Sequence, residues 1–257
     1  MCHGHESLKC WGRLMPSRVW VTRLRTSVML GCMQLYTFFR SSAAFRVRIA
    51  LQLKGLAYDS IPVHLLKGEQ KSDGYRAHVG DALVPTLVTD GGQSLNQSMA
   101  IIEYLDETHA NVPLLPHDAL GRAHVRGLAQ MVACDIHPLN NLRVLKYLVG
   151  PMGVAKELKN QWYAHWVRSG LEAFERQLAL LEAERAKAGL PASSFCWGDA
   201  PGLADCCLVP QVFNARAFGV SLEGLTRVQA ISDLCMTLPA FQQAQPSACP
   251  DAESDAK

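Results

Sequence analysis

The chain has 257 residues, of which 49% are hydrophobic and 19% are charged. This length and apolar content are enough for a substantial core in one large or two small domains, and they exclude an intrinsically disordered chain. The formal net charge of +2 is too small for a dedicated nucleic-acid-binding protein. No apolar run approaches the roughly 18 residues that a membrane-spanning helix requires, so we expect no membrane span.

Positive charge is concentrated in residues 1–32, which carry a net charge of +4 and leave −2 for the remaining residues. An arginine-rich start that is nearly free of acidic residues is compatible with an organellar transit peptide. We favour a second explanation, in which translation starts at Met33, directly before the first strand-like run. In both cases we expect residues 1–32 to lie outside the fold.

Nine cysteines are scattered along the chain, and this odd number does not fit a disulfide-rich secreted domain. We interpret them as reduced thiols and expect a cytoplasmic protein. The densest group of metal-ligand residue types is Cys2, His3, His5 and Cys10. Because this segment has no flanking helix or strand pattern, we predict no metal site.

The first predicted elements form a strand, a helix and a strand. Residues 35–39 are an aromatic and β-branched run, and residues 43–54 repeat apolar side chains at helical spacing up to Gly55. A second strand is predicted at residues 60–65, followed by a polar loop at 67–73. If the two strands are parallel, the connection between them is a right-handed crossover.

A hairpin and a helix complete this part of the chain. We predict a strand at residues 84–89, a turn at 90–92, a partner strand at 93–95 and a helix at 97–107. The order βαβ followed by ββα indicates a small α/β domain whose sheet mixes parallel and antiparallel strands.

The rest of the chain is predicted to be helical. Three long stretches have a helical period: residues 119–148, 157–188 and 203–218. The chain thus divides into an α/β domain over residues 33–112 and an all-helical domain over residues 118–246. A polar tail follows at residues 247–257, and we expect it to fray.

Four motifs resemble, in their order and spacing, the zeta class of glutathione transferases. They lie at residues 40–51, 83–87, 97–105 and 134–141. The last of them is similar to the bacterial maleylpyruvate and maleylacetoacetate isomerases within that class. The resemblance covers residues 33–246, and it implies a thioredoxin-like domain that binds glutathione, a helical bundle domain and a homodimer.

The catalytic group of such a site is the hydroxyl that stabilises the glutathione thiolate. Ser42 begins the first predicted helix, where a hydroxyl and the helix dipole together favour a thiolate over a thiol. Ser41 is the alternative donor. A role in helix capping alone is the other explanation for either serine, because turns before helices often contain serine.

The resemblance implies further glutathione-binding residues, which are Gln70, Val84, Pro85, Gln97, Ser98, His137 and Asn141. A cis bond before Pro85 would turn the Val84 main chain toward glutathione. Gln97 and Ser98 open a helix, whose free N–H groups suit the γ-glutamyl carboxylate, although Ser98 can also act as a plain cap. His137 precedes a proline and can equally be a structural residue.

The maleyl substrates are dianions, so a pocket for them should present guanidinium groups. Arg40, Arg143 and Arg216 are the candidates at matching positions, and a solvated charge is the alternative explanation for each. The resemblance implies glutathione-dependent cis–trans isomerisation, but the motifs do not distinguish maleylacetoacetate from maleylpyruvate. Two alternatives stay open: a general glutathione transferase that conjugates electrophiles, and a non-catalytic glutathione-binding module.

The chain departs from the zeta pattern in three places. Ala43 stands where the pattern has a cysteine, so no protein thiol is available there. Residues 78–81 differ from the usual Asn-Pro loop. Gly202 replaces a serine or threonine of a capping box, which predicts that the helix after it is less firmly nucleated, by about 1 kcal/mol or less.

Overall fold

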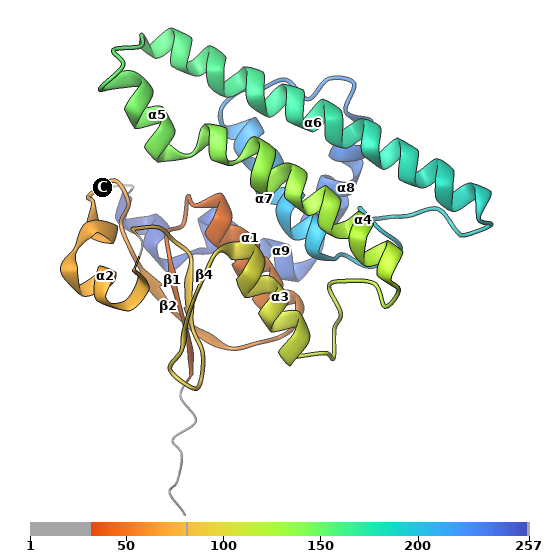
Figure 1. Cartoon of the computed structure of the whole chain (residues 1–257), viewed down its shortest axis with the longest axis horizontal. Helices are drawn as coiled ribbons and strands as arrows, with labels where there is room; N and C mark the ends of the chain where they lie inside the picture. The colour runs from red at the N-terminus through yellow and green to blue at the C-terminus, as the bar shows by residue number, and fades with distance from the viewer. Residues whose placement is uncertain (1–31, 81, 256–257) are drawn as a thin grey trace, which may run out of the picture. The chain divides into compact units, whose positions relative to one another are not determined.

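The computed structural model describes residues 32–80 and 82–255 (Figure 1). Our expectations for residues 1–31, including the start site, the targeting segment and the Cys2, His3, His5 and Cys10 group, lie outside these described residues. The described residues belong to one compact unit. The domain boundaries at residues 112 and 118 stay predictions.

Four strands form a mixed sheet in the order β2-β1-β3-β4. They are β1 (Met33–Thr37), β2 (Tyr58–Pro62), β3 (Thr86–Val88) and β4 (Ser94–Asn96). β1 pairs in parallel with β2 and antiparallel with β3, and β3 pairs antiparallel with β4. The predicted α/β domain with a mixed sheet is therefore confirmed.

Helices α1 (Ser42–Leu53) and α3 (Ser98–Thr108) pack against each other, and both begin within one residue of the predicted positions. Their apolar side chains, such as Phe45 and Ile101, join one core with the helical half of the chain. α1 also packs against α7 and α9. Because it has neighbours on so many sides, nearly all of α1 is buried from its first turn onward.

The loop predicted at residues 67–73 is partly helical, so this expectation was wrong. A 3-10 turn spans Glu69–Lys71, and α2 (Asp73–Val79) follows it. The Ser72 side chain caps α2 by accepting a hydrogen bond from the N–H of Tyr75. α2 is too short, and buries too few apolar side chains, to show a helical period in the sequence.

The helical half contains six described α-helices, and the prediction of a helical second domain is confirmed. They are α4 (Ala119–Gln130), α5 (Leu142–Val149), α6 (Lys156–Lys187), α7 (Leu203–Ala217), α8 (Thr226–Met236) and α9 (Pro239–Ala244). Figure 1 shows the long α6 running beside α4 and α5. None of the described helices combines the length and apolar character that crossing a membrane requires.

The predicted helix at residues 119–148 is interrupted at its centre. α4 continues into a π-helical turn at Met131–Ile136, and a 3-10 turn at Pro138–Asn140 precedes α5. Ile136 at the end of the π turn is buried against Gly170 of α6, where a Cβ atom would overlap the Ile136 side chain. The close approach of these two segments therefore explains a glycine in the middle of a long helix.

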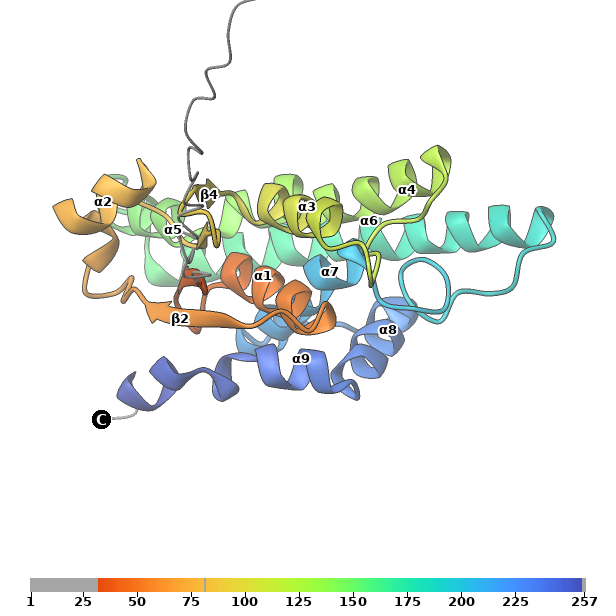
Figure 2. The ribbon, with the colours of Figure 1, turned by 90° about the horizontal axis from the view of Figure 1, so that it is seen from below.

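The tail does not fray over its first residues, so this expectation was also wrong. Two 3-10 turns, at Pro246–Ala248 and Pro250–Asp255, continue from α9 beside the end of β2 (Figure 2). Cys249 is buried in an apolar cluster with Phe38 and Phe39. The carboxylate of Asp251 accepts a hydrogen bond of 2.9 Å from the N–H of Phe39. These contacts join residues more than 200 positions apart, which composition alone does not reveal.

Gly202, which precedes α7, fits a narrow space. A Cβ atom at this position would lie 2.7 Å from the carbonyl oxygen of Leu114. The Gly202 N–H donates to Asp205 at 2.8 Å, and a second oxygen of that carboxylate accepts from the N–H of Cys196 at 3.0 Å. Half of the capping box is therefore retained, and the glycine permits a close backbone contact.

We predict that Gly170→Ala lowers the free energy of unfolding by up to about 2 kcal/mol, because overpacking costs about 1–3 kcal/mol and alanine regains about 1 kcal/mol of helix propensity. The measurement is urea denaturation. Gly127→Ala in α4 is the matched control, since no atom lies within 4 Å of a Cβ there. We expect this control to raise stability by up to about 1 kcal/mol. Equal effects of the two substitutions would contradict the close approach.

Candidate active site

The two serines at the start of α1 have different surroundings. Ser41 is the N-cap, and its Oγ accepts a hydrogen bond of 3.2 Å from the N–H of Ala44. Ser42 is the first helical residue and is buried, and its Oγ lies 3.1 Å from Nδ1 of His137. The first turn of α1 contains no acidic residue, so the positive end of the helix dipole is available to an anion.

His137 connects Ser42 to the start of α5. Its Nε2 lies 3.3 Å from Nδ2 of Asn141, and Oδ1 of Asn141 accepts from the N–H of Arg143 at 3.1 Å. The pKa of His137 is lowered to about 3, mainly by burial and then by the positive charges of Arg46 and Arg143. His137 as a whole residue is half-buried, and the protein around its ring and the two cations disfavour a second proton. The imidazole is therefore neutral at physiological pH.

Arg46 on α1 is a site residue that was not predicted from the sequence. It is 2% exposed, and its Nη1 donates to Oγ of Ser98 at 3.2 Å. Its Nε and Nη2 are buried and have no hydrogen-bond partner among the described residues. Burial lowers the pKa of Arg46, but a guanidinium stays charged in proteins. The result is a buried cation whose charge is only partly compensated by the protein around it.

Gln97 and Ser98, at the start of α3, lie next to Arg46. Ser98 is buried at the first position of α3, whose first turn has no acidic residue. Gln97 has φ 67°, and it is the one non-glycine residue with a positive φ in the described part of the chain. Such a backbone costs about 1–3 kcal/mol and occurs preferentially at functional sites. Neither the strain at Gln97 nor the contact between Arg46 and Ser98 is visible in the sequence.

The structure also shows the backbone and the surroundings of three other residues that were predicted to bind glutathione. The Val84–Pro85 bond is cis, as predicted, and Val84 is buried. Gln70 is buried rather than on the surface, and its Nε2 lies 3.5 Å from the carbonyl oxygen of Leu65. Its Oε1 has no partner among the described residues. The binding roles of these residues stay predictions.

Two of the three predicted substrate arginines flank the serine site. Arg40 directly precedes Ser41, is exposed, and places its guanidinium 5.2 Å from the centre of the Phe39 ring. Arg143, in the first turn of α5, is exposed and close enough to His137 to lower its pKa. Both cations are therefore available to a negatively charged substrate, and their roles stay predictions.

Arg216 has a different environment in the last turn of α7. Its Nη2 forms an ion pair of 2.7 Å with Oδ1 of Asp233, and both side chains are exposed. This pairing fits the alternative of a solvated surface charge. A substrate carboxylate would have to compete with Asp233 for Arg216, so the predicted role of this arginine has weaker support than that of Arg143.

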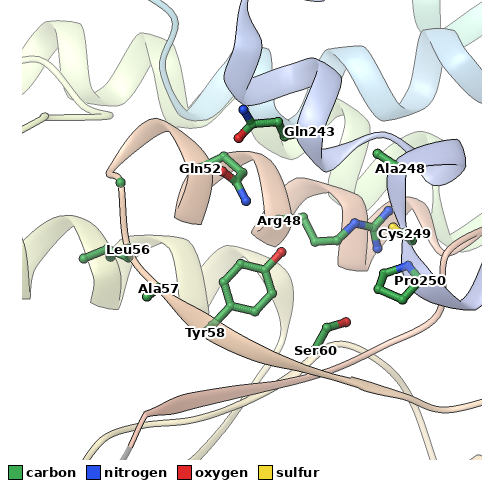
Figure 3. Close-up of a pocket in the computed structure, with 11 residues that line it drawn as sticks. Arg48, Gln52, Leu56, Ala57, Tyr58, Ser60, Gln243, Ala248, Cys249 and Pro250 are labelled. Atoms are coloured by element: carbon green, nitrogen blue, oxygen red, sulfur yellow. The ribbon is translucent and has the colours of Figure 1, made fainter.

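A cavity of about 510 Å³ lies between α1, β2 and the tail, and none of the predicted site residues lines it (Figure 3). Arg48, Tyr58 and Cys249 are among its lining residues. Arg48 donates from Nε to the carbonyl oxygen of Ala244 at 2.9 Å and from Nη1 to Oγ1 of Thr37, also at 2.9 Å. Because these donors are occupied by the protein itself, Arg48 has a structural role.

Two family models match the chain. The N-terminal domain of glutathione S-transferases matches residues 40–108, and the C-terminal domain matches residues 160–241. A maleylacetoacetate isomerase of Pseudomonas aeruginosa is 45% identical over 221 residues, which are 85% of this chain and 98% of that protein. The chain belongs to the glutathione S-transferase family.

Solved structures of other glutathione S-transferases agree with this assignment. A maleylpyruvate isomerase described as a bacterial zeta-class enzyme is 44% identical, with a TM-score of 0.79, covering 85% of this chain and 99% of that one. A maleylacetoacetate isomerase of Anaeromyxobacter dehalogenans, solved with glutathione in its active site, is 39% identical, with a TM-score of 0.74, covering 86% and 98%. The resemblance to the zeta class is thereby confirmed.

We predict that His137 makes this glutathione S-transferase less stable as the pH falls from about 6 to about 4. Its pKa is 6.5 in the unfolded chain and about 3 in the folded one. The unfolded state therefore binds up to one more proton than the folded state in this window, which costs up to about 1.4 kcal/mol of stability per pH unit. Urea unfolding at several pH values should show a shallower decline for His137→Gln, which does not titrate. Equal slopes would contradict the lowered pKa.

Proposed function

We propose that the chain catalyses glutathione-dependent cis–trans isomerisation of a maleyl dicarboxylate, either maleylacetoacetate or maleylpyruvate. The observation that carries this proposal is the buried hydroxyl of Ser42 at the positive end of α1, hydrogen-bonded to a neutral His137. A hydroxyl in this position can stabilise a thiolate. The similar proteins described above, which bear the names of the two isomerases, support the choice of reaction.

The described residues fit glutathione. The N-terminus of α3, with Ser98 and the buried Arg46 cation that donates to it, suits the γ-glutamyl carboxylate, because a nearby positive charge and free N–H groups both favour an anion. The main chain of Val84 suits the cysteinyl part, and Gln70 the glycine end. Ser42 then lies at the helix end where the sulfur is needed.

The chain's own residues contribute positioning and charge. When bound, glutathione supplies the thiolate that adds to the double bond and leaves again, so that rotation takes place about a single bond in between. Ser42 and the α1 dipole stabilise that thiolate before addition and after elimination. Arg40 and Arg143 hold the substrate carboxylates and stabilise the negative charge that develops on the substrate oxygen during addition.

We also propose that the protein is a cytoplasmic homodimer that acts in the catabolism of aromatic compounds such as tyrosine. Support for the cytoplasm comes from the seven described free cysteines, five of which are buried as thiols, since such thiols persist in a reducing compartment. Support for the dimer and the pathway comes from the resemblance to the zeta class. Sedimentation equilibrium measures directly whether the protein is a dimer.

The decisive assay compares both maleyl acids with and without glutathione. We expect the trans product to form only with glutathione, which is recovered unchanged. Arg143→Gln should raise KM for the dianion by about tenfold to a hundredfold, as expected for loss of a charge-assisted hydrogen bond of about 1.5–3 kcal/mol. No turnover of either acid would contradict the proposal. Conjugation of an uncharged electrophile, unaffected by Arg143→Gln, would instead support the general transferase.

We predict that Arg46→Met weakens glutathione binding about tenfold or more, because it removes the donor to Ser98 and a buried cation. Isothermal titration calorimetry measures the affinity. Stability should change little, since a buried charge with unpartnered nitrogens also carries a desolvation cost. Arg126→Met, which removes a partly exposed ion pair with Glu103, is the matched control and should leave the affinity unchanged. Unaltered binding by Arg46→Met would contradict the role of Arg46.

A further inference from the structure

The orientation of the Asn141 side chain is fixed by the backbone. Its Oδ1 accepts from the N–H of Arg143 at 3.1 Å, which is the N-cap hydrogen bond of α5. Its Nδ2 consequently faces Nε2 of His137 at 3.3 Å. An amide nitrogen only donates, so Nε2 must be the acceptor in this contact.

The proton on the His137 ring then has one position left. The ring is uncharged, and the charged groups that act on it, Arg46 and Arg143, are both cations that oppose a second proton. A neutral imidazole has one N–H, and with Nε2 bare this hydrogen is on Nδ1. Nδ1 lies 3.1 Å from Oγ of Ser42 and therefore donates to it.

The direction of this hydrogen bond determines what Ser42 can do. A hydroxyl has one hydrogen, and Ser42 does not need it for His137, because its oxygen already accepts from the ring. The hydrogen is thus available to an anion at the start of α1. With the opposite tautomer, Ser42 would donate to Nδ1 and present only lone pairs to a thiolate, which would repel it.

We propose that Asn141 is a positioning residue that holds His137 as the Nδ1–H tautomer and thereby makes the Ser42 hydroxyl a hydrogen-bond donor to the glutathione sulfur. The identity of the sulfur rests on the proposed function. The hydrogen bonds run in one direction, from the Arg143 N–H through Asn141 and His137 to Ser42. Asn141 acts on the sulfur only through its neighbours.

The tautomer is tested directly on the protein without substrate. In ¹⁵N-labelled protein, long-range ¹H–¹⁵N correlation spectra distinguish a protonated from a bare ring nitrogen, and His137→Gln assigns the signals. We expect Nδ1 protonated and Nε2 bare. Asn141→Asp keeps the shape and still caps α5, but a carboxylate only accepts, so His137 should change to the Nε2–H tautomer. A wild-type Nε2–H ring, or an unchanged tautomer in Asn141→Asp, would overturn the proposal.

The consequence for the sulfur is tested by titrating the ultraviolet absorbance of the thiolate of bound glutathione. Asn141→Asp should raise the thiol pKa by about one unit or more, the amount that a hydrogen bond to a charged group provides. Arg143→Gln is the matched control, because it changes the charge beside the same ring by the same amount and keeps the hydrogen bonds. An equal rise of the thiol pKa in Asn141→Asp and Arg143→Gln would show that the change in charge alone acts on the sulfur, and it would overturn the proposal.

A third variant separates charge from hydrogen bonding. Asn141→Ser keeps a capping oxygen for α5 but removes the Nδ2 donor without adding charge, so we expect a smaller rise in the thiol pKa than with Asn141→Asp. No rise would count against the proposal. If the protein fails to isomerise either maleyl acid, the proposed function fails, whereas the tautomer and the thiol pKa are still measured and decide the role of Asn141.

Discussion

The hydrogen bond between Ser42 and His137 is the contact on which the candidate site depends. The two residues are 95 positions apart, one at the start of α1 and the other directly after the π turn at Met131–Ile136. A π turn widens the helix by one residue and changes the direction of the side chains that follow. Ile136 anchors this turn against Gly170 of α6. A glycine that touches no site residue therefore helps to place His137 beside Ser42.

The two buried arginines on α1 have different roles, one in stability and the other in binding. Arg46 and Arg48 are two positions apart, and each is 2% exposed. Arg48 donates to groups near the end of β1 and to the carbonyl oxygen of Ala244, so its cost of burial is offset within the protein. Arg46 has one hydrogen bond, to Ser98, and two unpartnered nitrogens. A buried cation without full compensation inside the protein is a reason for the site to bind an anion.

The sequence predicts those helices whose apolar side chains recur with a helical period. α1, α3 and α6 were placed within a residue or two, because their apolar side chains recur over several turns. The π turn was not predicted, since the helical period continues through it, and α2 is too short to show one. The contact between Ser42 and His137 is long-range, and no periodicity reveals it. Arg46 was missed because charged residues on helices are normally exposed.

Hydrogen-bond direction is important in this site because the group at the start of α1 is the hydroxyl of Ser42. A cysteine titrates and can respond to its surroundings, whereas a serine hydroxyl stays protonated at physiological pH and can stabilise a thiolate only by donating. The protein must therefore control where the hydrogen points. Ser98 accepts from the guanidinium of Arg46, which cannot accept a hydrogen bond in return. Ser42 accepts from the His137 ring, whose tautomer is set by Asn141 and the backbone N–H that holds it. Both serines thus keep their hydrogens for the ligand.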